Sequence, residues 1–326
     1  MKISIVVATL NRDEDLKVLL ESLLIQTKLP FEIIVVDQSD DDSTKDLCLS
    51  YSSKLPLNYI HSTHKSGTHS RNIGIQKSTG DVVAFLDDDT KLLPDYLEQI
   101  EIFYRKYPHA IGGMGKIVNF MEFRDRLFGR GLLPLLYKLA ASFFGLNSFK
   151  KAFIILKSSR NIEYYDADHD IKVEWLSGLS WYRKEIFNEF KFEEKFEKWS
   201  FGEDRMLSYR IFKRYPASLY FCPNAKLYHF ESGRNRLPEQ DKIFMKVIYQ
   251  YWFAYSCVEK NPFFYWWGNM GEILLHLLNA SILRESFSNS WYYIKANLKL
   301  VCNLKRVKKG DLKNILTQVS HPPMGR

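Results

Sequence analysis

Apolar runs alternate with helical repeats along the first third of the chain. Short runs rich in Ile, Val and Leu, each bounded by polar turn residues, predict β-strands at 3–10, 31–39, 57–62 and 81–89. Apolar residues at helical spacing predict helices at 11–27, 68–79 and 93–107, and a polar loop and a short helix are expected between the strands at 31–39 and 57–62. Strands that alternate with helices in this way are typical of an α/β fold, with a mostly parallel central sheet and helices on both faces.

The first predicted helix begins with residues that suit a helix start. We expect Asn11 to cap it, and acidic residues fill its first turn, where the helix dipole favours negative charge. In sheets of this class, ligands bind beyond the carboxyl ends of the strands. The site is therefore expected at the polar residues that end the predicted strands, namely Thr9, Asp37 and Asp87 to Asp89.

The chain changes character after residue 120. The segment 120–172 is apolar with interspersed basic residues and breaks the alternation. The next pattern predicts a strand, a turn and a helix start at 173–187, a helix at 201–215, and short strands at 218–223 and 225–230. From 237 onward the chain reads as helical, aromatic and basic. We therefore predict an α/β domain at 1–236 and a helical C-terminal extension at 237–326.

Composition narrows the class of protein. With 46% hydrophobic and 26% charged residues, the chain is globular rather than disordered. Its formal net charge of +8 favours acidic partners such as nucleotides, diphosphates or anionic lipid headgroups. The four cysteines show no metal-ligand or redox-motif spacing and are typical of reduced thiols in the cytoplasm. The apolar run at 3–10 is too short for a signal peptide, so none is expected.

Three consecutive acids, Asp87 to Asp89, follow the apolar residues of the strand at 81–89. Like charges this close repel one another, and burial disfavours each charged form. One interpretation is a turn or helix start, with Thr90 and Pro94 beside it. The other is a bound cation. On an extended backbone, Asp87 and Asp89 point to one side of the strand and Asp88 to the other.

The first strand is followed by "ATLNR", which contains neither a glycine-rich dinucleotide motif nor a P-loop. A phosphate-binding site without such a glycine cradle needs another source of positive charge. A divalent cation held by carboxylates supplies it, and hard oxygen ligands suit Mg²⁺ or Mn²⁺.

Four segments follow one another along the chain in this order: "SIVVATLNR", "EIIVVDQSDDDST", "SRNIGIQKSTGDVVAFLDDD" and "WLSGLSWYRKEIF…FGEDRMLSYR". Over about residues 2 to 235, this order resembles the family 2 glycosyltransferases, which are inverting enzymes with the GT-A fold. The resemblance implies that the nucleoside of a sugar-nucleotide donor is held by Thr9, Asn11, Arg12 and Asp37. Many members have a second acid where this chain has Gln38, which leaves Asp37 as the carboxylate expected to bind the base.

The resemblance also assigns the acidic run. In the family, a D-x-D motif binds the divalent metal that bridges the donor's diphosphate. It maps onto Asp87, Asp88 and Asp89, with Asp89 the expected direct ligand, Asp87 beside it, and Asp88 on the donor.

Glu203 and Asp204 match the family's "ED" pair at the start of a helix. Acids at a helix N-terminus also complement its dipole without any catalytic role. The resemblance favours catalysis, in which a general base takes the proton of the attacking acceptor hydroxyl. We expect Asp204 to be the base and Glu203 to orient acceptor hydroxyls.

Further residues have two interpretations each. His229 resembles a late family histidine that reaches the metal or diphosphate, and a buried structural histidine fits the same pattern. Gly178 is expected to allow close approach of either substrate or backbone. Basic side chains expected to face the diphosphate, or merely solvent, are Arg71, Lys65, Arg234 and Arg236. Trp175 and Trp181 fit either sugar stacking or the core.

The segment 261–283 is apolar but contains Glu272, and a glutamate at a bilayer centre is costly. We therefore expect no membrane span. Peripheral contact is suggested by the Trp and Tyr residues together with the lysines that follow. A helical appendage packed on the catalytic domain is the other interpretation.

Together these observations predict a metal-dependent, inverting glycosyltransferase that builds a bacterial surface polysaccharide. It would transfer a sugar from a nucleotide-diphosphate donor to the hydroxyl of a glycan or lipid-linked acceptor. It would bind no nucleic acid and would reside in the cytoplasm, in peripheral contact with the inner face of the cell membrane. The alternatives are a nucleotidyltransferase, which usually has a glycine- and arginine-rich loop after the first strand, and a non-catalytic glycan-binding relative.

Overall fold

The computed structural model describes residues 1–120, 139–148, 150, 152–196, 201–230, 232–233, 237–258, 262–282, 287–313 and 315. Arg234 and Arg236 lie outside the described residues. The chain forms two compact units, the first made of 1–127, 164–194 and 203–236, and the second of 128–163, 195–202 and 237–326. The division at residue 236 stays a prediction, because the second unit also takes in segments from the middle of the chain.

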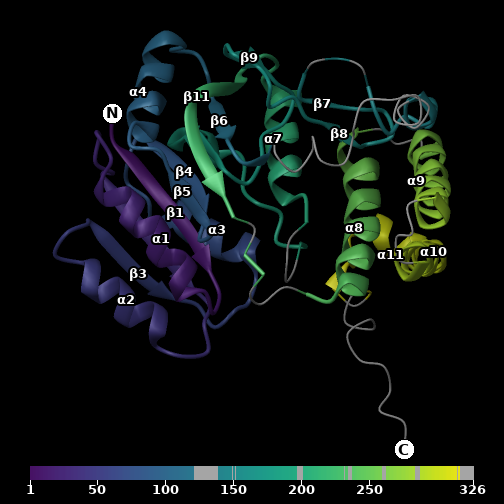
Figure 1. The fold of residues 1–326 in the computed structure, drawn as a ribbon, viewed down its shortest axis with the longest axis horizontal. Helices are drawn as coiled ribbons and strands as arrows, with labels where there is room; N and C mark the ends of the chain where they lie inside the picture. The colour runs from purple at the N-terminus through teal and green to yellow at the C-terminus, as the bar shows by residue number, and fades with distance from the viewer. Residues whose placement is uncertain are drawn as a thin grey trace, which may run out of the picture. The chain divides into compact units, whose positions relative to one another are not determined.

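A nine-stranded sheet forms the centre of the first unit (Figure 1). Its order is β3 (Leu57–His61), β2 (Glu32–Asp37), β1 (Ile3–Thr9), β4 (Val82–Asp87), β10 (Ser180–Arg183), β6 (Gly112–Ile117), β11 (Leu219–His229) and β5 (Thr90–Leu92). The ninth strand, β9 (Ile171–Lys172), pairs with β11. The four strands from β3 to β4 are parallel, and β10 runs antiparallel to both of its neighbours.

The strand register places the predicted site residues at one edge of the sheet. Thr9 lies opposite Asp37, and Ala8 lies opposite Asp87. The apolar residues before them are buried on both faces, as expected for parallel strands that helices cover. Burial of these runs fixes the register, so the polar residues that end β1, β2 and β4 meet at the carboxyl edge.

The predicted helices of the first unit are present as α1 (Asp13–Leu24), α3 (Gly67–Lys77), α4 (Tyr96–Lys106) and α7 (Glu203–Arg214). The short helix expected between the second and third strands is α2 (Ser43–Tyr51), and the helix start expected at the end of 173–187 is the 3₁₀ helix η1 (Lys184–Asn188). The prediction that Asn11 caps α1 is wrong. Arg12 holds the N-cap position without a side-chain cap bond, while Asn11 adopts a φ of 54° and bonds to Asp40.

The strands of the second half of the sheet differ from the sequence pattern. The segments at 218–223 and 225–230 form one strand, β11, whose register against β6 shifts between Cys222 and Lys226. The strand predicted at the beginning of 173–187 lies later, as β10. The strands β5 and β6 were not predicted.

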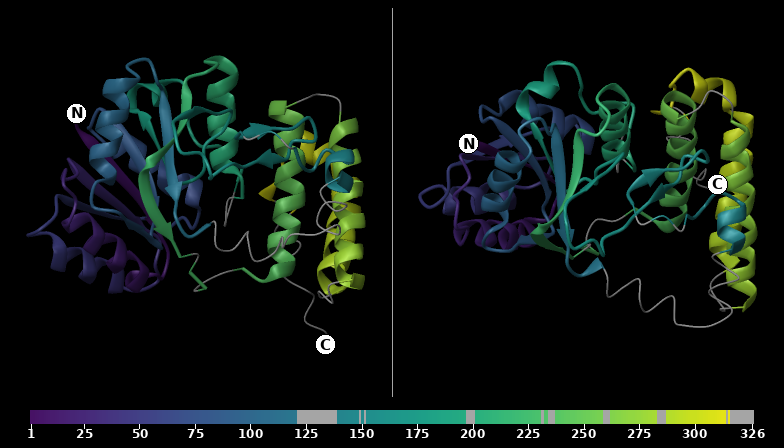
Figure 2. Two further views of the ribbon diagram at one scale, coloured as in Figure 1. Left: turned by 45° about the horizontal axis from the view of Figure 1, so that its top comes forward. Right: turned by 90° about the horizontal axis from the view of Figure 1, so that it is seen from above.

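The second unit contains the hairpin of β7 (Ile154–Ile155) and β8 (Asn161–Ile162) together with the C-terminal helices (Figure 2). These are α8 (Glu239–Phe253), the π-helix η2 (Ala254–Val258), α9 (Phe263–Ile282), α10 (Phe287–Cys302) and α11 (Leu304–Lys308). Within this unit α10 packs against both α8 and α9.

Glu272, the acid that interrupts the apolar segment, lies on α9 in a charged cluster. Its carboxylate pairs with Arg160 at 2.7 Å and with Lys246 of α8 at 2.9 Å. The same lysine also donates to the Tyr293 hydroxyl at 2.7 Å. Glu272 therefore serves to join helices of this unit. Among the described residues, none of the helices combines the length and the apolar character that crossing a membrane requires.

Candidate active site

Asp87, Asp89 and His229 face one another at the carboxyl edge of the sheet. Each offers one ligand atom, and these atoms all lie within 4.8 Å of one another. His229 Nε2 is 3.1 Å from Asp89 Oδ1 and 3.9 Å from Asp87 Oδ2. The Ser232 amide donates to Asp89 Oδ2 at 2.8 Å and holds that carboxylate in place. Two carboxylates and one imidazole are a donor set that fits a divalent cation.

Asp88 points away from this cluster and is buried. The Thr9 hydroxyl donates to its Oδ2 at 2.7 Å, and Arg12 Nη1 donates to its Oδ1 at 3.1 Å. Burial raises the pKa of Asp88 to about 7, although Arg12 and Thr9 oppose this change. Arg12 also lies 3.7 Å from Asp89. The end of β1 is thereby tied to the acidic run.

The pKa of Asp89 shifts in the opposite direction. Burial raises it, but the contact with His229, the amide of Ser232 and the charge of Arg12 together lower it below its ordinary value. These contacts favour the ionised form of Asp89, which is the form of a carboxylate that binds a metal.

Arg71 connects the acidic run to the helix that carries the "ED" pair. Its Nη2 donates to Asp87 at 2.9 Å, and its Nη1 forms a short contact with Glu203 at the start of α7. Burial opposes the charge of Arg71, but Glu203 and Asp87 raise its pKa above the ordinary value. Burial likewise raises the pKa of Glu203 to about 7, which Arg71 partly offsets.

Gly178 lies at the centre of these side chains. A Cβ at this position would be 3.5 Å from Arg71, and 3.8 Å from both Asp204 and Asp87. A methyl group would fit, but any larger side chain would fill the space in front of the two carboxylates. Burial raises the pKa of Asp204, whose Oδ1 accepts the amide of Arg205 at 2.7 Å. Asp204 Oδ2 faces this space.

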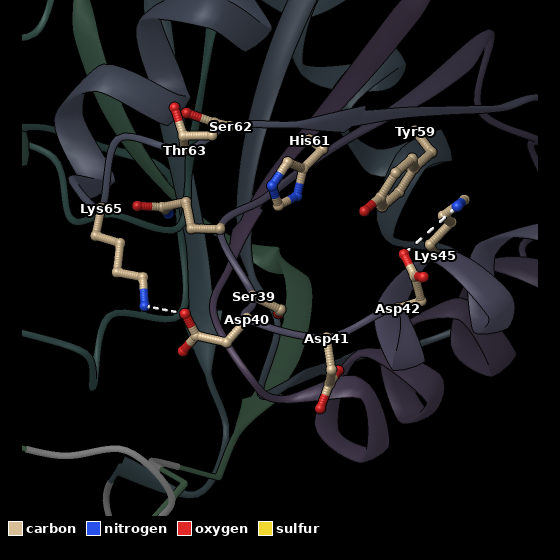
Figure 3. Close-up of a pocket in the computed structure, with 11 residues that line it drawn as sticks. Ser39, Asp40, Asp41, Asp42, Lys45, Tyr59, His61, Ser62, Thr63 and Lys65 are labelled. Carbon is tan, nitrogen blue, oxygen red and sulfur yellow. Dashed lines mark hydrogen bonds and ion pairs between the residues drawn. The ribbon is translucent and has the colours of Figure 1, made fainter.

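A cavity of about 570 Å³ adjoins the carboxyl ends of β2 and β3 (Figure 3). Its lining is polar and carries both signs of charge: Gln38, Ser39, Asp40, Asp41, Asp42, Lys45, Tyr59, His61, Ser62, Thr63 and Lys65. Asp37 lies beneath it and is fully buried. Its carboxylate accepts the Ser39 amide at 2.9 Å and the Tyr59 hydroxyl at 2.9 Å. Asp37 thus orients two residues of the cavity wall.

One side of the cavity is closed by contacts to Asp40. Lys65 Nζ donates to its Oδ1 at 2.5 Å, and the side-chain amide of Asn11 donates to its Oδ2 at 3.1 Å. The bond from Lys65 lowers the pKa of Asp40. Lys65 therefore contacts the loop after β2, and its predicted place at the diphosphate stays a prediction.

The sequence did not single out Tyr59 or His61 as site residues. Both belong to β3, whose carboxyl end pairs with that of β2 through Asp37 and His61. The sequence pattern predicts no strand order, so this adjacency was not predicted. Trp175 and Trp181 are buried at 4% and 0% exposure, and the Trp181 ring lies edge-on to Tyr96. Both tryptophans belong to the core.

Comparison with known proteins agrees with this architecture. Residues 4–149 match the family model described as glycosyl transferase family 2. The uncharacterized glycosyltransferase YwdF of Bacillus subtilis is 35% identical over 125 residues, which are 37% of this chain and 45% of that protein. The glucosyl-dolichyl phosphate glucuronosyltransferase of Haloferax volcanii is 32% identical over 130 residues, which are 36% of this chain and 39% of that protein. The chain thus matches less than half the length of either relative.

The fold also resembles that of solved structures along nearly its whole length. The crystal structure of S. aureus TarS 1–349 in complex with UDP-GlcNAc aligns over 97% of this chain and 90% of that one, at 18% identity and a TM-score of 0.56. The complex of the same protein with UDP gives a TM-score of 0.52. The match at 4–149 and the mixed sheet both bear out the resemblance of the sequence motifs to the family 2 glycosyltransferases and to their α/β fold.

Proposed function

We propose that the protein is a metal-dependent, inverting glycosyltransferase that uses a nucleotide-diphosphate sugar. The observation that carries this proposal is the gathering of Asp87, Arg71 and Asp204 around Gly178 at the carboxyl edge of the sheet. A carboxylate of the cluster that could hold a metal, Asp87, and the proposed base, Asp204, therefore face the same space beside Gly178. The similarity to TarS, whose structures hold UDP and UDP-GlcNAc, supports a nucleotide sugar as donor.

In this proposal, the donor lies along the carboxyl edge. Asp87, Asp89 and His229 would hold Mg²⁺ or Mn²⁺, and a cation bound there would neutralise the diphosphate leaving group. The base and ribose would occupy the cavity beside β2 and β3. The residues proposed to shape the donor site, directly or by holding its walls, are Thr9, Asn11, Arg12, Asp37, Arg71, Asp87, Asp88 and Gly178.

Asp204 would act as the general base. Its raised pKa brings it closer to neutral pH, where a base both exists in its charged form and accepts a proton readily. The acceptor hydroxyl would lose its proton to Asp204 as its oxygen attacks the anomeric carbon from the side opposite the diphosphate. Attack from that side inverts the configuration. Glu203, held by Arg71, would orient the acceptor.

The biological setting is part of the proposal. The acceptor would be a glycan or a lipid-linked glycan of a bacterial surface polysaccharide. The protein would work in the cytoplasm at the inner face of the membrane, in peripheral contact with it. The family match at 4–149 favours glycosyl transfer over nucleotidyl transfer, and the presence of both acidic motifs favours it over glycan binding alone.

A thermal-shift screen of nucleotide sugars with Mn²⁺ tests donor use. A true donor at one hundred times its dissociation constant should stabilise the first unit by about 2.7 kcal/mol. Incubation of that donor with simple glycan acceptors should then give a product whose anomeric configuration is opposite to the donor's, as measured by NMR. A product with retained configuration would contradict the proposed mechanism, and stabilisation by no nucleotide sugar would contradict the proposed substrate class.

A further inference from the structure

The helix α10 exposes a stripe of large apolar and basic side chains. The stripe consists of Trp291, Lys295, Leu298 and Val301, and it continues into α11 with Lys305. The four residues on α10 follow one another at intervals of three or four, so they share one side of that helix. The three apolar side chains are 53%, 61% and 51% exposed, respectively. We call this set the outer stripe.

The outer stripe does not hold the second unit together. The opposite side of α10 does so, with Tyr293, Ala296 and Leu300 at 4% exposure or less. That side packs against α8 and α9, which lie beside α10 in Figure 1. Exposed apolar side chains that recur along one helix face are typical of surfaces that bind a partner.

The charge around the outer stripe indicates the chemistry of that partner. Residues 287–313 contain seven basic side chains and one acidic side chain, Asp311, which pairs with Arg306 at 2.8 Å. Lys295 Nζ lies 5.3 Å from the centre of the Trp291 ring, so cation and aromatic ring are presented together. A second copy of the same face would be repelled, because it carries the same charge. An acidic protein would match the charge but would leave the apolar row unexplained.

We propose that the outer stripe docks on the surface of an anionic phospholipid bilayer. Trp291, Leu298 and Val301 would enter the boundary between headgroups and acyl chains, while Lys295 and Lys305 contact lipid phosphates. Tryptophan favours that depth, and basic residues beside it are attracted to anionic headgroups. This inference rests on the peripheral membrane contact in the proposed function, and it assigns the residues and the lipid class.

Co-sedimentation of the full chain with vesicles tests the proposal. At physiological salt, vesicles of phosphatidylcholine with phosphatidylglycerol should bind the protein, and vesicles of phosphatidylcholine alone should not. Leu298→Ser should weaken binding about tenfold, since it removes a buried apolar side chain at the membrane. Lys295→Gln and Lys305→Gln should each weaken it about fivefold, because a lysine near an anionic surface contributes roughly that much.

Two substitutions on α1 and α2 of the first unit serve as matched controls. Leu49→Ser removes a leucine that is 60% exposed, nearly the same as Leu298, and Lys17→Gln removes an exposed lysine. Both should leave vesicle binding unchanged, and all variants should keep the wild-type melting temperature. Calorimetry of UDP binding with Mn²⁺ should give equal affinities for the wild type and the stripe variants. Failure of UDP binding would therefore count against the proposed donor, not against the docking surface.

Three outcomes would overturn the inference. Equal binding to neutral and anionic vesicles, or none to either, would exclude anionic lipid as the partner. If the lysine variants lost vesicle binding while Leu298→Ser bound fully, binding would come from unspecific charge attraction and not from insertion of the apolar side chains. Self-association that disappears in Leu298→Ser, measured by sedimentation velocity without vesicles, would assign the stripe to a second copy of the chain.

Discussion

Replacing Arg71 with methionine tests the electrostatics of the site. The substitution keeps much of the side-chain volume and removes the only charge that contacts both Asp87 and Glu203 among the described ion pairs. Asp87 and Glu203 would then lose their ion-pair partner, and Glu203 and Asp204 would lose a charge that lowers their pKa values. Removing one partner of a buried ion pair costs about 3–5 kcal/mol, and we expect a loss of stability of this size at pH 8.5.

The loss should depend on pH in a definite direction. Burial already raises the pKa of Glu203 to about 7, and without Arg71 it should rise further. A carboxyl group with a raised pKa favours the folded state at low pH, and this contribution falls as pH rises through the folded pKa. Below about pH 7, Glu203 is protonated in both proteins, so the penalty should shrink. Above about pH 7, Glu203 loses its proton in the wild type but keeps it in the variant. The free energies of unfolding of the two proteins should then diverge by about 1.4 kcal/mol per pH unit, or roughly 2 kcal/mol by pH 8.5.

Urea unfolding at pH 6 and pH 8.5 measures this difference, and hydrogen exchange in β4 and α7 locates it. Arg105→Met is the matched control, because Arg105 pairs with Glu101 at 3.3 Å but is 75% exposed. An exposed pair of this kind contributes less than about 1 kcal/mol. If Arg71→Met were as stable as the control at pH 8.5, the account of Arg71 as the charge that holds the site would be refuted.

Three further substitutions have separate readouts. Asp89→Asn should weaken binding of Mn²⁺ with UDP by about 2 kcal/mol or more in calorimetry, and equal affinity would remove Asp89 from the metal site. Glu203→Gln should raise the KM for acceptor more than it lowers turnover, and steady-state kinetics would contradict this if turnover alone fell. Glu272→Gln should destabilise the second unit by about 3–5 kcal/mol at neutral pH, because Arg160 and Lys246 lose their shared acid. Burial alone would raise the pKa of Glu272, but these two cations hold it below its ordinary value. The contribution of Glu272 to the free energy of unfolding is therefore complete above about pH 4.5 and is lost as the pH falls through the folded pKa. A difference in urea unfolding that is as large at pH 2 as at neutral pH would contradict this.

The parallel part of the sheet could be predicted because its strands are buried on both faces and read as continuous apolar runs. The strand β6 could not, since its sequence GGMGKI has few side chains to form a pattern. The residues packed against β6 explain why these positions are glycines. A Cβ at Gly113 would lie 2.8 Å from the Trp181 ring, and one at Gly115 would lie 2.2 Å from the Ala225 carbonyl oxygen. Such close approach arises only in the folded sheet.

The candidate site, like the sheet, could be predicted from the sequence only in part. Strand ends and helix starts are local, so Asp87 to Asp89 and the "ED" pair could be found in the sequence. The ion pair between Arg71 and Glu203 joins residues 132 positions apart, and no local pattern encodes it. The cavity wall has a similar origin, because Tyr59 reaches Asp37 only through the pairing of β2 with β3.

The most direct test of the proposed function is made on Asp204→Asn. Asparagine keeps the size of the side chain and can still accept the amide of Arg205, but it cannot take up the proton of the acceptor. Donor affinity and transfer rate should be measured on one preparation, with the nucleotide sugar found by thermal shift. We predict wild-type donor affinity and a transfer rate lower by about 10²–10⁴, the usual contribution of a positioned base. A near-normal transfer rate in Asp204→Asn would contradict the assignment of the base and, with it, the proposed catalytic mechanism.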